Sequence, residues 1–290
     1  MLLSLIWSTS FIAIEFAIET ASPVLVAFGR TFLASVILSL IVLKLKLKFP
    51  RDIKTWRVLF WSGLTGATLP FMLFSWGQQY LDSGTTGILM AFTPISTMFL
   101  AYMMTDNEKL TPYKLLGGFL GLIGVFILLG GVKTASIEMG ILPPLAIILA
   151  TIGYAFSSIV LKKTAHLSSV VGSAGLMIMA NLSLIPFLIW QWNTLNFNLS
   201  MNSILGISFL GVFSTAIGVI IMLRLIHKTS ASFMSLNNYL VPGLAILWGV
   251  MFLGERFSVN TFLGFLLIIS GLATASYRPL HRKTQTKNPP

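Results

Sequence analysis

The sequence predicts an all-α polytopic membrane protein in which ten transmembrane helices form two inverted five-helix repeats. Three observations support this fold class: the composition, a series of apolar segments, and a motif that recurs in the second half. Of the 290 residues, 56% are hydrophobic and only 9% are charged. This balance excludes an ordinary soluble domain, in which about 25% of residues are charged.

The apolar segments are about 20 residues long, which is the length that a helix needs to cross a hydrocarbon core of roughly 30 Å. Met1 leads directly into the first segment, so no separate cleavable signal is expected. Proline, serine and charged residues mark the breaks between segments. In chain order, the breaks include Ser22-Pro23, Phe49-Pro50, Leu110-Thr111-Pro112, Pro143-Pro144 and Glu255-Arg256. The predicted spans lie near 2–18, 24–43, 57–79, 84–104, 112–131, 140–161, 169–190, 203–226, 231–253 and 258–276.

A motif around spans four and five recurs around spans nine and ten. Its elements are, in order, a proline, an acid, a hydroxyl residue and two glycines. The first copy contains Pro94, Glu108, Thr111, Gly117 and Gly124, and the second contains Pro242, Glu255, Ser258, Gly264 and Gly271. Because each repeat holds an odd number of spans, the second copy is inverted in the membrane. The predicted units are residues 1–134 and 135–277, followed by a basic tail at 278–290, and inverted repeats are typical of secondary transporters.

The basic residues follow the same topology. The chain has 19 Lys and Arg against 8 Asp and Glu, a net charge of +11. Most Lys and Arg lie in alternate loops and in the tail, whereas the other loops hold only Lys133 and Arg256. The positive-inside rule then places both termini in the cytoplasm. The basic excess therefore indicates a multi-pass protein of the cytoplasmic membrane, surrounded by lipid, and not a nucleic-acid partner.

Several kinds of chemistry have no signal in the sequence. Cysteine is absent, and His166, His227 and His281 have no second ligand at metal-binding spacing. A glycine loop with a phosphate-binding lysine is also missing, which disfavours ATP-driven transport. The sequence therefore predicts no enzyme, no metal and no cofactor.

Span one carries the sharpest functional candidate, Glu15. A carboxylate inside an apolar span is costly and must face protein or water. Such a group suits proton coupling or an anchor for a substrate amine. The alternative is that Glu15 and Glu19 lie together in the wet interface at the end of the span. Arg30 in span two is interpreted as structural, either snorkelling to the interface or pairing with Glu15.

Other candidates lie on spans one, three, six and nine. Aromatic side chains can stack on a substrate or face a cation, although Trp and Tyr near span ends are also common interfacial anchors. Amides in span nine precede a proline that frees a backbone carbonyl, which indicates either a binding patch or a bridge between helices. The candidate binding residues are Trp7, Trp76, Gln79, Tyr154, Asn237, Asn238 and Tyr239.

Four segments of this sequence are similar to the drug/metabolite transporter superfamily, and to its EamA-type ten-span permeases in particular. They are Trp7–Ile14, Phe28–Ala34, Gln79–Gly84 and Leu253–Arg256. The resemblance implies a carrier whose central cavity opens alternately to each side, with spans five and ten packed outside it. Glycines at 117, 121, 124, 264 and 271 suit the close packing of those two helices.

The resemblance also implies a small-molecule substrate. Export of amino acids or related metabolites is the first expectation, coupled to protons or to the substrate's own gradient. Efflux of toxic, multidrug or nucleotide-like compounds is the alternative, and a membrane scaffold without transport is a third. Both a monomer and a homodimer are compatible with the sequence.

Overall fold

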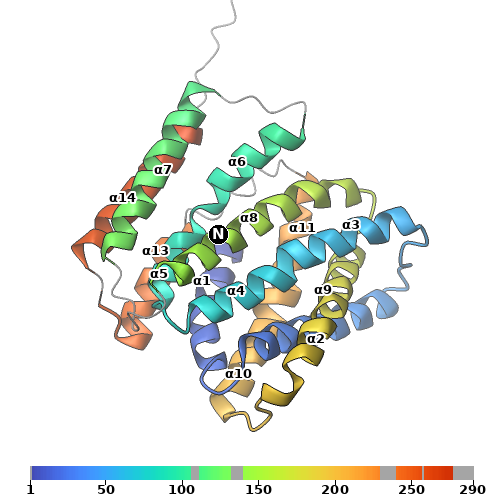
Figure 1. The fold of residues 1–290 in the computed structure, drawn as a ribbon. Coiled ribbons are helices and arrows are strands. Elements are labelled where there is room, and N and C mark those ends of the chain that lie inside the picture. Colours follow the sequence, from blue (N-terminus) through green and yellow to red (C-terminus); the bar gives the residue numbers. More distant parts are fainter. Residues whose placement is uncertain (1, 106–110, 132–139, 229–239, 257, 277–290) are drawn as a thin grey trace, which may run out of the picture.

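The computed structural model describes residues 2–105, 111–131, 140–228, 240–256 and 258–276. All regular elements within these ranges are helices (Figure 1). They cover the described part of every predicted span, with ends that differ from the prediction by a few residues. The predicted start of span nine falls within residues 229–239, outside the described ranges, so only its later part is described.

The first half contains five helical stretches, two of which are interrupted. The third stretch includes a short π-helical segment, η1, and the fourth is broken after Met90. The elements are α1 (Leu2–Ala17), α2 (Pro23–Lys44), α3 (Ile53–Gly63), η1 (Leu64–Thr68), α4 (Leu69–Gly77), α5 (Ser83–Met90), α6 (Thr93–Met104) and α7 (Pro112–Gly131).

The second half follows a similar plan within its described residues. Its elements are α8 (Leu142–Leu161), η2 (Lys162–Thr164), α9 (Ser169–Gln191), η3 (Trp192–Thr194), α10 (Met201–Phe209), η4 (Leu210–Ile217), α11 (Gly218–Lys228), α13 (Leu240–Trp248), η6 (Gly249–Leu253) and α14 (Val259–Ser276). The segment η4 is π-helical, like η1, and both interrupt a long helix that begins at a side-chain cap. Asp52 caps α3 and Ser200 caps α10.

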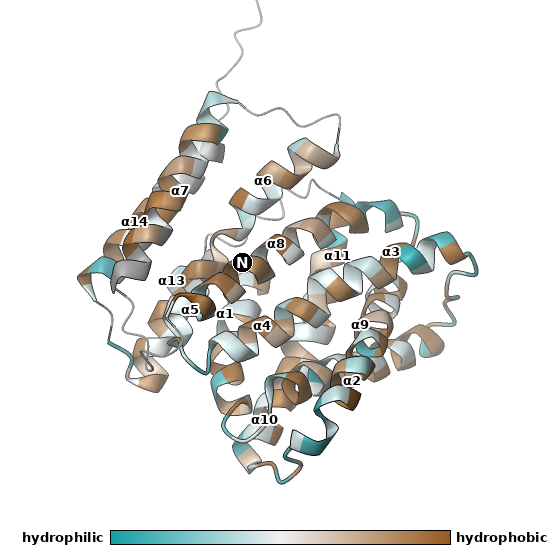
Figure 2. Ribbon diagram, in the orientation of Figure 1, coloured by the Kyte–Doolittle hydropathy of each residue, from teal (hydrophilic) through white to brown (hydrophobic). Residues whose placement is uncertain are grey.

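Six of the described helical stretches are long and apolar enough to cross a membrane. Shorter apolar helices lie at Leu2–Ala17, Val241–Leu253 and Val259–Gly271. Large apolar side chains are exposed on the helices, as Phe126 and Trp190 are at 80% each. The ribbon coloured by hydropathy is largely hydrophobic along the helices (Figure 2). Such surfaces are typical of helices that face lipid. The fold is therefore that of an all-helical, polytopic membrane protein.

The helices α7 and α14 form a pair at one side of the molecule, packed mainly on each other (Figure 1). A Cβ atom added to Gly124 would lie 2.8 Å from the Gly264 carbonyl oxygen. One added to Gly271 would lie 2.5 Å from the Gly117 carbonyl oxygen. These distances leave no room for a side chain, which confirms the prediction that the glycines let the two helices approach closely.

Candidate functional site

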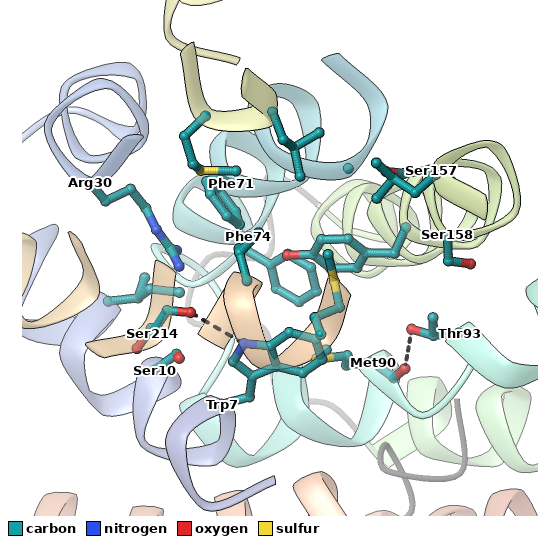
Figure 3. A pocket seen from close by; sticks show the side chains of 18 of the residues that line it. Trp7, Ser10, Arg30, Phe71, Phe74, Met90, Thr93, Ser157, Ser158 and Ser214 are labelled. Atoms are coloured by element: carbon teal, nitrogen blue, oxygen red, sulfur yellow. Dashed lines mark hydrogen bonds between the residues drawn. The ribbon is translucent and has the colours of Figure 1, made fainter. Parts of the chain in front are cut away.

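A central cavity of about 80 Å³ lies among the helices of both halves (Figure 3). By volume it has room for roughly two to three water molecules. Its wall comes from α1, α2, η1, α4, α5, α6, α8, α9, η4 and α11. Its lining residues include Trp7, Ser10, Phe11, Ile14, Arg30, Phe71, Phe74, Tyr154, Leu176, Met177, Ser214 and Met222.

Aromatic rings form much of the cavity wall. Phe74 and Tyr154 stack with ring centroids 5.8 Å apart, and the Trp7 indole Nε1 donates a hydrogen bond to the Ser214 carbonyl oxygen at 3.3 Å. The close-up shows the Trp7 ring extending across the cavity toward Ser214 (Figure 3). Trp7 and Tyr154 therefore both lie where the sequence analysis expected a binding surface, while their role in binding stays a prediction.

Arg30 is the cation of this wall, and it is only 5% exposed. Its Nε donates a hydrogen bond to Thr215 Oγ1 at 3.0 Å, and its guanidinium carbon lies 3.7 Å from the centre of the Phe71 ring. Within the described ranges, its terminal NH₂ groups make no hydrogen bond, and no acidic residue lines the cavity. The expected alternative of a pair with Glu15 is not what the structure contains, because Arg30 is bonded to Thr215 instead.

A polar pocket of about 570 Å³ lies next to the central cavity, lined by Glu15, Phe16, Ile18, Glu19, Gln78, Gln79 and Asn202. Glu15 Oε2 is buried and has no hydrogen-bond partner in the described part of the chain. Two consecutive residues of α1 line different spaces: Ile14 lines the cavity and Glu15 lines the polar pocket.

One hydrogen bond connects the wall of the cavity to the wall of the polar pocket. Phe11 and Phe74 line the cavity, with ring centroids 6.1 Å apart. Gln78, which lines the pocket, donates from Nε2 to the Phe11 carbonyl oxygen at 2.9 Å. This contact ties α1 to the end of α4.

The remaining sequence candidates fall in different places. Gln79 lines the polar pocket with Glu15. Trp76 packs against Tyr80 with ring centroids 5.4 Å apart, and it lines neither the cavity nor the polar pocket. Asn237, Asn238 and Tyr239 lie outside the described residues.

Glu255 makes a contact that the repeat motif alone did not reveal. Its carboxylate accepts hydrogen bonds from the backbone N–H groups of Ser83, at 2.7 Å, and Gly84, at 3.1 Å. It therefore caps the N-terminus of α5 from the loop between η6 and α14. A Cβ atom at Gly249 would collide with this carboxylate, so glycine leaves space for the contact.

Asp82 lies beside this cap, immediately before α5. Burial raises the pKa of the Asp82 carboxyl, and repulsion from the Glu255 carboxylate raises it further. Glu15 also interacts electrostatically with Glu255 and Asp82. Three carboxyl groups therefore meet at this end of the helices, and one of them joins the two halves of the chain.

The fold is that of an all-helical membrane protein with a cavity lined by helices from both parts of the chain. The sequence model of the EamA-like transporter family matches residues 1–130 and 142–277. The chain belongs to this family, whose members transport solutes and are not enzymes.

Relatives named as transporters align over most of the chain. The uncharacterized transporter YoaV of Bacillus subtilis is 25% identical over 97% of this chain and 96% of its own. The S-adenosylmethionine/S-adenosylhomocysteine transporter of Chlamydia trachomatis is 30% identical over 87% of this chain and 80% of its own. A probable terminal-alkyne amino-acid exporter of Streptantibioticus cattleyicolor is 22% identical over 98% and 94%.

The crystal structure of another protein supports the fold. It covers 94% of this chain and 94% of its own, with a TM-score of 0.67 and 18% sequence identity. At that identity the likeness concerns the fold alone.

Proposed function

We propose that this transporter exports amino acids or related small metabolites across the bacterial cytoplasmic membrane by alternating access. The observation that carries the proposal is the central cavity, whose wall comes from both halves of the chain. A cavity at the interface of two halves is the arrangement that alternating access requires.

The proposal includes ten spans arranged as two inverted repeats, with both termini in the cytoplasm. Two stretches of the chain match the family model, and π-helical segments interrupt α3–α4 and α10–α11 alike. Reporter fusions at Lys54 and Asn198 test this topology. We expect them on opposite sides of the membrane, and finding both on the same side would refute the arrangement.

Two kinds of relatives suggest the substrate class. S-adenosylmethionine and terminal-alkyne amino acids both carry an amino-acid head group, and these are the compounds that the names of two relatives contain. Transport of compounds with this head group by the present chain is an inference from similarity.

The test is efflux from proteoliposomes loaded with a panel of labelled amino acids and metabolites, with and without an imposed pH gradient. Saturable efflux of one chemical class supports the proposal and identifies the substrate. Absence of flux from folded protein across the whole panel would contradict it and favour a scaffold without transport.

We further propose that Glu15 carries the coupling proton. Its buried, unpartnered Oε2 in the polar pocket supports this role, because a carboxylate in that position can exchange protons with one side. The Glu15→Gln substitution should abolish the response of transport to the pH gradient. Glu19→Gln is the matched control, since Glu19 lines the same pocket but is exposed and bonded to Ser200. Equal responses of the two variants would exclude Glu15 from coupling.

Efflux of aromatic or amphipathic drugs is the second candidate function, favoured by the rings of Trp7, Phe71, Phe74 and Tyr154 in the cavity wall. If the protein exported such drugs, aromatic cations would compete with the transported substrate. We expect no such competition, because Arg30 in the same wall repels cations.

A further inference from the structure

We propose that Arg30 binds the carboxylate of the substrate in the central cavity, and that the α-amino group of an amino acid is dispensable there. The transported class would then be small carboxylates with an apolar or aromatic body, amino acids among them. This inference rests on the proposed transport function and names the group by which its cavity selects a substrate.

Arg30 carries a buried charge that has no ionic partner in the described part of the chain. Its side chain is only 5% exposed, yet only its Nε is hydrogen-bonded, to Thr215. In the part of the chain that the structure describes, the two terminal NH₂ groups have no hydrogen-bond partner. A buried charge without a counter-ion is strongly unfavourable. A carboxylate suits the free edge of a guanidinium because two parallel hydrogen bonds can form there.

A second, independent observation comes from the neighbouring side chains. Ser214 is 2% exposed, and its Oγ is buried without a hydrogen-bond partner among the described residues. Ser214 lines the same cavity, and the close-up shows it lying near Ser10 and Trp7 on the side toward which the Arg30 guanidinium points (Figure 3). Tyr154 also lines the cavity and interacts electrostatically with Arg30. Ser214 and Tyr154 therefore add hydroxyl donors to the same cavity wall as Arg30.

The inverted halves supply an internal control for the arginine. Ser22 caps α2 by accepting from the Leu25 N–H, and Ser168 caps α9 by accepting from the Val171 N–H. Counted from these caps, Arg30 in the first half corresponds to Leu176 in the second. Leu176 also lines the cavity and is 1% exposed. An apolar side chain therefore satisfies the packing at this helix position, and the fold alone does not require a charge there.

The rest of the wall defines the body of the substrate. Phe71, Phe74, Trp7, Met177 and Met222 surround the space next to Arg30 with rings and thioethers. These groups favour apolar and aromatic substituents. No acidic side chain among the described lining residues is available to pair with an ammonium group, which is why the amino group should contribute little.

The test compares three probes on the purified full-length protein: L-phenylalanine, 3-phenylpropanoate, which lacks the ammonium group, and L-phenylalaninamide, which lacks the carboxylate. Ligand-dependent thermal stabilisation measures binding, and counterflow in proteoliposomes measures transport. We expect both carboxylates to bind about 10- to 100-fold more tightly than the amide, which is the range for a charge-assisted hydrogen-bond pair.

Variants separate binding from folding. Arg30→Leu copies the residue at the corresponding position of the second half and should remove the preference for carboxylates. Arg30→Lys keeps the charge and should retain part of the preference. Thr215→Val removes the hydrogen bond to Nε and should lower the melting temperature while retaining the preference for carboxylates.

Each outcome is informative. Equal binding of the amide and the carboxylates by the wild type, or an unchanged preference in Arg30→Leu, would overturn the proposal. The same holds if folded wild-type protein responds to none of the three probes. Saturable transport of the amide without the acids would refute the carboxylate site while leaving the transport function intact.

Discussion

Removing the Glu255 carboxylate should release the N-terminus of α5 and open the end of the protein where the polar pocket lies. The carboxylate accepts two backbone hydrogen bonds, at 2.7 and 3.1 Å, from the first residues of α5. Loss of a helix N-terminal cap costs about 1–2 kcal/mol of stability. Because Glu255 is partly exposed, solvent screens its charge, and the loss should not exceed that range.

This contact joins residues 171 and 172 positions apart in the sequence, so a conformational change that separates the two halves at this end must break it. If it exists only in the conformation described here, losing about 1–2 kcal/mol shifts the conformational equilibrium by roughly 5- to 30-fold. Glu255→Ala should give the full shift. Glu255→Gln should give a smaller one, because an amide oxygen still accepts a hydrogen bond.

The absence of cysteine makes the shift directly measurable. In the proposed topology the end near Glu255 faces outward, so a single cysteine at Ser10, in the cavity wall, should react with a membrane-impermeant maleimide applied to intact cells only when that end opens. The modification rate should rise roughly 5- to 30-fold in the Glu255→Ala background. Glu19→Ala serves as the control, since this exposed acid accepts a hydrogen bond from Ser200 and makes none with α5 among the described residues. An unchanged rate in folded Glu255→Ala protein would refute the role of the cap in closure.

Two further predictions concern stability. Gly124→Val should lower the free energy of unfolding by about 1–3 kcal/mol, since its Cβ would lie 2.8 Å from the Gly264 oxygen and the Ile268 nitrogen. Thermal unfolding measures the loss. Gly243→Ala is the control and should change little, because among the described residues its Cβ would approach Phe265 alone, at 3.9 Å. Asp82 has a raised pKa in the folded state, so its contribution favours folding at low pH and is lost as the pH rises above the ordinary value of 3.8. Asp82→Asn should therefore raise the melting temperature relative to wild type at pH 7 more than at pH 4, and a larger gain at pH 4 would contradict this sign.

The sequence predicted the helices well because a long apolar segment bounded by polar breaks is a strong local signal. The rotation of each helix about its axis was not predictable in the same way. Ile14 and Glu15 are neighbours on α1, yet one lines the cavity and the other the polar pocket. That difference depends on how the helices around α1, mainly α10 and α13, pack against it, and no periodicity within α1 contains this information.

The same reason explains the residues that sequence reasoning placed differently. Trp76 is an aromatic residue near the end of a span, and its packing against Tyr80 outside the cavity depends on the rotation of α4. Arg30 was expected to be structural because a charge in an apolar span often pairs with another. That it has no counter-ion among the described residues depends on how the neighbouring helices pack. A comparison of the two serine caps, in contrast, uses sequence positions alone and would have matched Arg30 with Leu176.

In the proposed alternating-access cycle, the difference between Arg30 and Leu176 makes the two halves of the cavity unequal. Two inverted halves with the same sequence would exchange conformations at no cost in free energy, and the cavity would present the same surface to both sides. A charge in one half alone makes the two orientations of the cavity unequal. Because Nε of Arg30 is bonded to Thr215 in the other half, any movement between the halves also changes the environment of this cation. The residue that selects the substrate would then also make its affinity depend on the side to which the cavity opens, and an exporter requires such a difference between binding and release.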